Sequence, residues 1–196
     1  EHPEKWAESF PIDVYQGGAG TSVNMNCNEV IANIGLEFLG LNKGNYGELH
    51  PNDHVNKSQS TNDVYPTALR ISLYQQLDDL LQVLADLIST IRLKADEYKF
   101  ALKMGRTQLQ DAVPMTVGQE FNAFATLLNE DLRLIDQMRQ LLLEINLGAT
   151  AIGTGVNSPV GYAHRITENL SQLTGLSFKG AEGLSGDASG APPPYL

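Results

Sequence analysis

The chain has 196 residues, of which 42% are hydrophobic and 18% charged, a composition typical of folded globular proteins. Its 13 basic and 23 acidic residues give a net charge of −10, which argues against nucleic acid as the main partner. A small anion can still bind such a protein at a local group of N–H donors. Because the sequence has no apolar run of 18 residues, we expect no membrane-spanning segment.

The cysteine content and the first residues bear on the cellular location and on whether the chain is part of a longer protein. Cys27 is the only cysteine, so no disulfide can form within the chain, and a reducing, cytoplasmic location is expected. Cys27 lies in an apolar helical pattern, which favours a packed thiol over a reactive one. The chain lacks an initiator Met and a signal-peptide pattern, so we expect it to begin inside a longer protein.

Apolar residues recur three and four positions apart along most of the chain, and this predicts an all-α fold without strands of useful length. The two longest helices have few partners within 196 residues, so apolar stripes would stay exposed. We therefore expect a bundle of long helices that is completed by oligomerisation. The predicted helices cover about residues 26–41, 60–98, 116–146 and 162–173.

The first polar segment that suggests chemistry is the glycine run Gly17 to Ser22, just before a predicted helix. Glycines let backbone N–H groups come close to an anion. The segment is not a Walker loop, because no Gly-Lys-Ser/Thr follows. By itself the segment is a weak signal for an anion site, and the local pattern favours a plain turn before a helix.

The second polar segment, Asn56 to Asp63, ends at the predicted start of the longest helix. One of Ser60, Thr61 and Asn62 is expected to cap that helix, but a cap does not require all three. Hydroxyl groups beside the free N–H groups of a helix N-terminus form a suitable site for a carboxylate.

The third polar segment, Gly105 to Asp111, also precedes a long helix. It can be read as a connecting loop with an Arg-Asp pair or as a second carboxylate clamp. The four histidines have no companion Cys, so no metal site is predicted.

These three segments, in their order and spacing, resemble the first two signature regions of the aspartase/fumarase superfamily, and the resemblance also covers Leu147 to Gly155. The chain resembles that family from about Phe10 to Leu176. The resemblance implies helical subunits, a homotetramer built around a long helical bundle, and active sites that draw residues from three chains. By this resemblance, residues 1–60 would end an N-terminal domain, and residues 61–183 would form an incomplete central bundle domain. Residues 184–196 read as a linker-like tail that does not match the family.

Two departures from class II fumarases make the chain more similar to the aspartases. Those fumarases typically read Thr-Gly-Ser-Gly-Thr-Gln where this chain has residues 17–22, and they carry His at the position of Gln108. Gln108 can form hydrogen bonds but cannot take up a proton at neutral pH. The resemblance therefore implies a carbon–nitrogen lyase that eliminates ammonia from L-aspartate to give fumarate.

Two alternatives remain open at this point. A class II fumarase is supported by His50 to Asp53, which resembles the segment of a second, non-catalytic anion site in those enzymes. The second alternative is a piece of a non-catalytic helical assembly, in which the polar segments only cap helices.

The resemblance also implies roles for single residues. Thr21, Ser60, Thr61 and Thr107 would hold the β-carboxylate, and Asn62 and Gln108 would orient the amino group or the α-carboxylate. No cofactor is implied, and activation by Mg²⁺ is left open. The family's third signature, which carries the serine base and a substrate-binding lysine, is absent from these 196 residues. We therefore expect no catalytic base in this chain and no activity from it alone.

Overall fold

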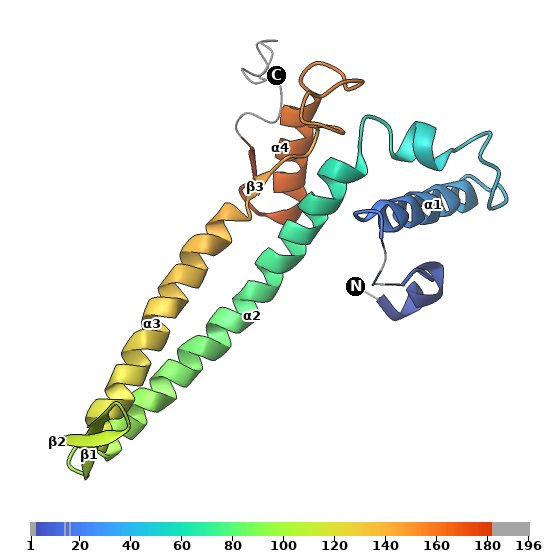
Figure 1. Ribbon diagram of the computed structural model, residues 1–196. Coiled ribbons are helices and arrows are strands. Elements are labelled where there is room, and N and C mark those ends of the chain that lie inside the picture. Colours follow the sequence, from blue (N-terminus) through green and yellow to red (C-terminus); the bar gives the residue numbers. More distant parts are fainter. Residues whose placement is uncertain (1–2, 14, 16, 182–196) are drawn as a thin grey trace. The chain divides into compact units, whose positions relative to one another are not determined.

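The computed structural model describes residues 3–13, 15 and 17–181, and this part of the chain is mostly helical (Figure 1). The predicted all-α fold is thereby confirmed. None of the described helices combines the length and the apolar character that crossing a membrane requires. The helical elements are the 3-10 turns η1 Pro3–Lys5 and η2 Ala7–Ser9, α1 Thr21–Phe38, the short π-helix η3 Pro51–Val55, α2 Thr61–Glu97, α3 Val117–Leu141 and α4 Tyr162–Thr174.

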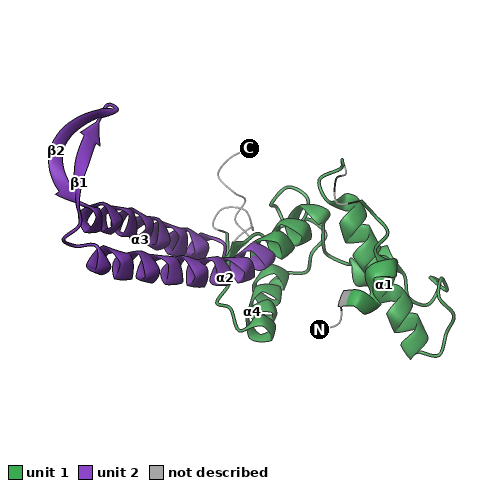
Figure 2. Cartoon of the chain, turned by 90° about the horizontal axis from the view of Figure 1, so that it is seen from below, with its two compact units in different colours: residues 1–70, 143–196 green, residues 71–142 purple. Residues whose placement is uncertain are grey.

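The chain divides into two compact units, shown in different colours in Figure 2. Unit 1 comprises residues 1–70 and 143–196, and unit 2 comprises residues 71–142. The helix α2 begins in unit 1 and continues into unit 2. The domain division expected from the family resemblance remains a prediction, and the linker-like tail lies outside the described residues.

The helix α1 begins five residues earlier than the apolar pattern predicted. Its buried positions are Asn24, Asn28, Ala32 and Leu36, which recur every fourth residue. The buried stripe of α1 is therefore half polar, and an apolar pattern cannot reveal it. The bounds of α2 and α4 agree with the prediction to within one or two residues, and Pro66 is accommodated in the first turns of α2.

The expectation of no strands was wrong between α2 and α3. There β1, Leu102–Thr107, pairs with β2, Gln110–Thr116, as an antiparallel hairpin in unit 2. Thr107 pairs with Gln110, so Gln108 and Leu109 form a two-residue loop with φ values of 49° and 65°. Such loops normally contain Asn or Gly, because both central residues need positive φ. This sequence lacks that signal. In unit 1, the two-residue strands β3, Glu144–Ile145, and β4, Lys179–Gly180, pair in parallel.

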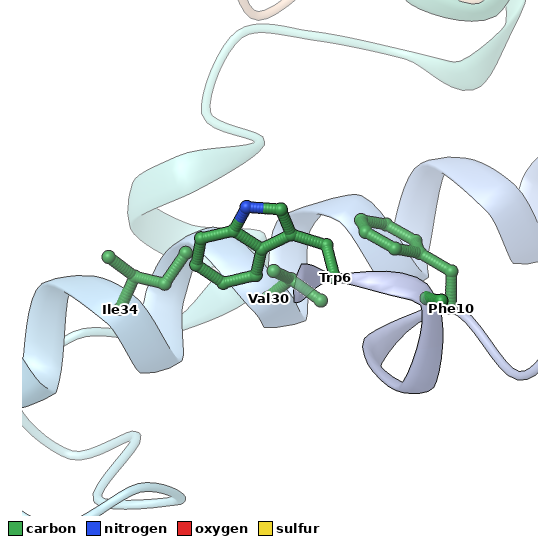
Figure 3. Close-up of a pocket in the computed structure, with 5 residues that line it drawn as sticks. Trp6, Phe10, Val30 and Ile34 are labelled. Atoms are coloured by element: carbon green, nitrogen blue, oxygen red, sulfur yellow. The ribbon is translucent and has the colours of Figure 1, made fainter. Parts of the chain in front are cut away.

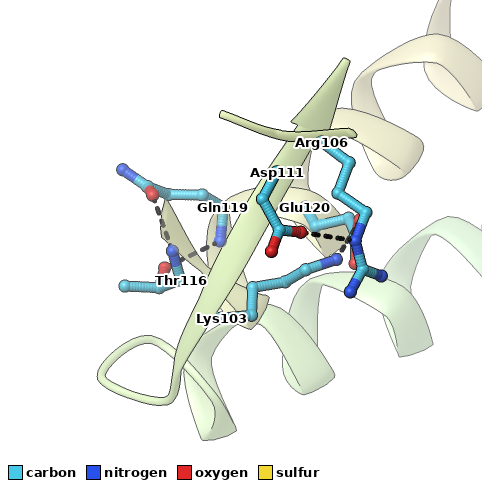
Figure 4. A network of polar contacts seen from close by, with 6 residues as sticks. All are labelled: Lys103, Arg106, Asp111, Thr116, Gln119 and Glu120. Carbon is cyan, nitrogen blue, oxygen red and sulfur yellow. Dashed lines mark hydrogen bonds and ion pairs between the residues drawn. The ribbon is translucent and has the colours of Figure 1, made fainter. Parts of the chain in front are cut away.

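Charged and polar contacts attach the hairpin to the start of α3 (Figure 4). Lys103 Nζ on β1 lies 2.5 Å from Glu120 Oε1 on α3, and Arg106 Nε lies 3.0 Å from Asp111 Oδ1 across the hairpin. Thr116 and Gln119 form a reciprocal capping box, with N–H to side-chain oxygen distances of 3.1 and 2.9 Å. The cap satisfies N–H groups at the helix start, so it fixes where the hairpin ends and α3 begins.

We predict that Gly118→Ala destabilises the fold, although Ala normally favours a helix over Gly by up to about 1 kcal/mol. A Cβ at this position would lie 2.7 Å from Lys99 Cα and would also overlap the Ala95 carbonyl oxygen. The free energy of unfolding, measured by urea denaturation, should fall by about 1–3 kcal/mol. Gly47→Ala is the control, because the nearest atom to a Cβ there is 3.9 Å away. An unchanged or higher stability of Gly118→Ala would contradict close packing of α3 on the end of α2.

Candidate carboxylate-binding site

The first turns of α1 and α2 lie against each other in unit 1. Gly20, which precedes α1, has a φ of 87°, and a Cβ there would lie 2.5 Å from ring atoms of Tyr65. Only glycine permits both the positive φ and this close approach. One turn further along α1, Asn24 Nδ2 donates a hydrogen bond of 3.0 Å to Thr61 Oγ1. The fold thus brings the Thr21 segment together with Ser60, Thr61 and Asn62, as a shared site would require.

Ser60 is the N-cap of α2. Its Oγ accepts a hydrogen bond of 3.2 Å from the Asn62 N–H, while its own N–H donates to Asp63 Oδ1 at 3.0 Å. These two hydrogen bonds satisfy backbone N–H groups at the start of α2. Capping therefore uses Ser60 Oγ only as an acceptor, and its hydroxyl proton can still donate to a ligand.

Asn62 connects the start of α2 to the loop before α4. Its side-chain Nδ2 donates to the Ala151 backbone carbonyl at 2.7 Å, and the backbone carbonyl of Asn62 accepts from Asn146 Nδ2 at 3.0 Å. One of its two amide protons is used in this contact, and the side chain is exposed. The loop that carries Gly148 to Gly155 is thus attached directly to the candidate site.

Asp63 was not among the predicted site residues, yet it organises this region. Its side chain is 0% exposed, and Oδ2 accepts a hydrogen bond of 2.8 Å from the Thr150 N–H. Burial raises the pKa of the Asp63 carboxyl, and the N–H groups of Ser60 and Thr150 oppose that shift. The Ser-x-x-Asp spacing from Ser60 is a recognisable capping pattern, but nothing in the sequence indicates the contact with Thr150.

Three buried or half-buried amides behind Thr61, those of Asn24, Asn28 and Asn56, were also not predicted as part of the site. Asn24 and Asn28 are each 5% exposed, and both donate to Asn56 Oδ1, at 3.3 and 3.1 Å. The spacing of four residues between Asn24 and Asn28 is the only sign of them in the sequence. Buried amides of this kind need partners, and this group supplies them internally.

Thr107 and Gln108 belong to unit 2, at the end of the β1–β2 hairpin. Both are exposed, and Gln108 has positive φ, which costs energy in a residue other than glycine. Arg106 and Asp111 form an ion pair, as expected if this segment is a plain connecting loop with an Arg-Asp pair. The roles of Thr107 and Gln108 toward a ligand remain predictions.

A separate hollow in unit 1 has different chemistry (Figure 3). It lies where the N-terminal turns meet α1 and is lined by Trp6, Ala7, Phe10, Val30 and Ile34. These side chains carry no charge, so they do not suit a dicarboxylate.

The side chains that could bind a metal ion or act as a reactive thiol give no second site in the described residues. In the described ranges, His, Cys, Asp and Glu form no group of three or more that would hold a metal ion. The thiol of Cys27 is half-buried, and burial raises its pKa, which agrees with a packed thiol.

The contacts at the start of α1 and α2 define what the site can do. Ser60 and Thr61 offer hydroxyl protons and Asn62 offers an amide proton, all at the N-terminus of a long helix. Thr21 lies at the start of α1, which has no side-chain cap. Neutral donors beside two helix N-termini favour a small anion. They can bind a carboxylate and stabilise charge on it, but they are poor proton acceptors at neutral pH.

We predict that Asp63→Asn lowers the free energy of unfolding by about 1–3 kcal/mol, because the amide must turn its NH₂ group toward an N–H donor. Burial raises the pKa of Asp63 above its ordinary value of 3.8, so the folded state holds this proton more tightly than the unfolded state. This contribution to stability is fully present below pH 3.8 and is lost as pH rises through the raised pKa. The difference in free energy of unfolding between the wild type and Asp63→Asn should therefore become smaller as pH rises from 3.8 through the raised pKa of Asp63.

Urea denaturation at a series of pH values tests this. Asp79→Asn is the control, because Asp79 is an exposed carboxylate on the same helix. A wild-type advantage that widens with rising pH would show that the hydrogen bonds to ionised Asp63 outweigh its burial.

Comparison with known proteins identifies the family. The family model described as lyase matches residues 2–185. An aspartate ammonia-lyase from Escherichia coli strain K12 is 57% identical over 180 residues, which cover 92% of this chain and 38% of that protein. One from Bacillus subtilis strain 168 is 51% identical with the same coverage. The chain thus spans 38% of the length of these curated relatives.

Solved structures agree with the sequence matches. The fold is similar to the fumarate lyase:delta crystallin from Brucella melitensis bound to cobalt, with a TM-score of 0.86 and 50% identity, covering 92% of this chain and 39% of that one. It is also similar to a class II fumarase from Schistosoma mansoni, with a TM-score of 0.81 and 35% identity, covering 89% and 40%. The resemblance to the aspartase/fumarase superfamily is confirmed, and the chain belongs to the lyase family.

Proposed function

We propose that this chain is the part of an aspartate ammonia-lyase that binds the substrate carboxylates, in the reversible conversion of L-aspartate to fumarate and ammonia. The observation that carries the proposal is the meeting of the first turns of α1 and α2, where the Asn24–Thr61 hydrogen bond joins two of the three motif segments. The 57% identity to an aspartate ammonia-lyase, against 35% to a class II fumarase, favours aspartate as the substrate.

The chemistry explains why neutral donors are useful there. Removal of a proton from Cβ of aspartate leaves a second negative charge on the β-carboxylate, an aci-carboxylate. The Cα–N bond then breaks, and the nitrogen leaves as ammonia while the electron pair on Cβ forms the double bond of fumarate. Donors that strengthen their hydrogen bonds as this charge develops lower the barrier more than they tighten substrate binding.

The proposed roles follow the family resemblance. Thr21, Ser60, Thr61 and Thr107 hold the β-carboxylate, and Asn62 and Gln108 orient the amino group or the α-carboxylate. The elimination needs no redox cofactor. The serine that takes the Cβ proton belongs to the third signature region, outside these 196 residues.

A homotetramer is the proposed assembly, and the exposed apolar surface of unit 2 supports it. Long helices that leave such residues in water are normally covered by other helices. The exposed apolar residues of α2 and α3 in unit 2 are Leu73, Leu80, Val83, Leu87, Leu93, Phe124, Leu127, Leu134, Met138 and Leu141. A reducing, cytoplasmic location is proposed as well, because Cys27 is free.

Class II fumarase is the second candidate. The segment that kept it open, His50 to Asp53, has a local structural role, because His50 Nδ1 accepts from the N–H groups of Asn52 and Asp53 at 3.1 and 3.2 Å. That contact caps η3 and does not require an anion site.

We predict that a complete subunit carrying this sequence releases fumarate from L-aspartate, followed by absorbance at 240 nm. Thr61→Val should lower kcat/KM by about 100-fold, the usual cost of one donor to a developing oxyanion, without a matching loss of stability. Thr90→Ala, elsewhere on α2, removes a hydroxyl that only bonds the Asp86 carbonyl, and it should leave turnover unchanged. Activity restricted to malate and fumarate would support the fumarase instead. Full activity of Thr61→Val would show that this polar segment only caps the helix, as the non-catalytic alternative predicts for this part of the chain.

A further inference from the structure

We propose that Asn24 is a positioning residue that points the hydroxyl proton of Thr61 toward the substrate carboxylate. The inference rests on the proposed function, in which Thr61 is one of the donors to that carboxylate. Asn24 itself contacts no part of the substrate in this proposal. It acts by occupying the hydroxyl oxygen of Thr61 with a donor, so that the proton must point elsewhere.

The amides behind Thr61 form a closed set of hydrogen bonds. Asn24 Nδ2 donates to Thr61 Oγ1 at 3.0 Å and to Asn56 Oδ1 at 3.3 Å. Asn28 Nδ2 donates to Asn56 Oδ1 at 3.1 Å and to Asn24 Oδ1 at 3.4 Å. Asn56 completes the set through its Nδ2, which lies 3.5 Å from the Gln59 carbonyl.

This set fixes which end of the Asn24 amide faces Thr61. If the Asn24 amide turned over, its Oδ1 would face Asn56 Oδ1, and its Nδ2 would face Asn28 Nδ2. Two like groups would then oppose each other at both ends, inside a site where Asn24 and Asn28 are each 5% exposed. Turning Asn56 over instead would direct its NH₂ group at two other NH₂ groups. Each amide therefore holds the next in place, and Asn24 is a donor to Thr61.

The orientation of the Thr61 hydroxyl follows from that assignment. A hydroxyl has one proton and two acceptor positions, and the Asn24 NH₂ group can only donate to it. Asn24 therefore fills one acceptor position of Oγ1, and the proton lies away from it. Among the described residues, no acceptor takes the proton of the Thr61 hydroxyl, although the side chain is half-buried.

The position of Thr61 makes this unused donor useful to an anion. Thr61 is the first residue of the 37-residue helix α2, where the unsatisfied N–H groups and the helix dipole favour negative charge. A hydroxyl whose oxygen is already occupied does not have to reorient when a carboxylate arrives. Such preorganised donors are more effective than donors that must turn during the reaction.

The first test is a double-mutant cycle in a complete subunit carrying this sequence, with kcat and KM measured for L-aspartate. Asn24→Leu keeps the size of the side chain but cannot donate, and it should lower kcat/KM by about tenfold when Thr61 is present. In a Thr61→Val background there is no hydroxyl to orient, so the same substitution should have almost no further effect. A merely structural role for Asn24 predicts an equal loss in both backgrounds, and that result would overturn the proposal.

Asn33→Leu is the matched control. Asn33 lies on the same helix, and its side chain bonds Tyr46 Oη at 3.2 Å and the Gly44 N–H at 2.9 Å, away from Thr61. It should cost stability in urea denaturation while kcat/KM stays within about twofold of the wild type. A tenfold loss of activity in this control would mean that any broken contact on α1 affects turnover, which contradicts a specific role for Asn24.

A second variant keeps the proposal testable if Asn24→Leu does not fold. In Asn24→Asp the ionised carboxylate can only accept, so it would draw the Thr61 proton away from the substrate. Protonation restores a donor, so kcat/KM relative to the wild type should rise as pH falls. Division by the wild-type values cancels the pH effects that both proteins share, including any that arise at Asp63. Asn24→Asp combined with Thr61→Val should lose this rise, and a rise that persists would contradict the proposal.

The outcome for the unmodified subunit separates the two proposals. If it acts on neither aspartate nor malate, the proposed function fails and this inference fails with it. If it acts on aspartate while Asn24→Leu has full activity, only this inference fails.

Discussion

The buried carboxylate of Asp63 is the contact on which the candidate site depends. It joins the start of α2 to the loop at Thr150, 87 residues later in the chain, and it also accepts from the N–H of Ser60. A buried ionised group is costly unless its oxygens are hydrogen-bonded, so the loop and the helix start must stay together for Asp63 to be tolerated. The same turn of α2 carries Ser60, Thr61 and Asn62. The Asp63 carboxylate therefore holds the residues proposed to bind substrate in place, although it is not itself proposed to contact the substrate.

The region around Thr61 shows how an acidic protein can receive an anion. The net charge is −10, but the side chains that meet at the first turns of α1 and α2 are mostly hydroxyls and amides. The one carboxylate among them, Asp63, has both oxygens engaged by backbone N–H groups. Local donors and helix ends decide what binds over short distances, while screening by salt weakens the effect of distant charges.

Unit 2 differs from the polar region around Thr61, because many apolar side chains of unit 2 are exposed. The loop of the β1–β2 hairpin adds Leu109, which is 99% exposed, next to Gln108 in a backbone conformation that favours glycine. Exposed apolar side chains and strained backbone are both unfavourable in an isolated chain. Both features fit the proposed assembly, in which other chains would cover these helices and residues from several chains would form each site.

The sequence alone determined the helical fold, the extents of α2 and α4 and the family, because these depend on local periodicity and on motif residues that are close in the chain. It also identified Ser60 to Asn62 as the start of a helix, because capping is a short-range interaction. The hairpin was missed because Gln108 and Leu109 are not turn-forming residues, and the start of α1 was missed because its buried stripe contains asparagines. Only the tertiary structure placed Asn24 against Thr61 and Asp63 against Thr150. Those contacts join residues 37 and 87 positions apart, and a pattern of neighbouring residues holds no information about such pairs.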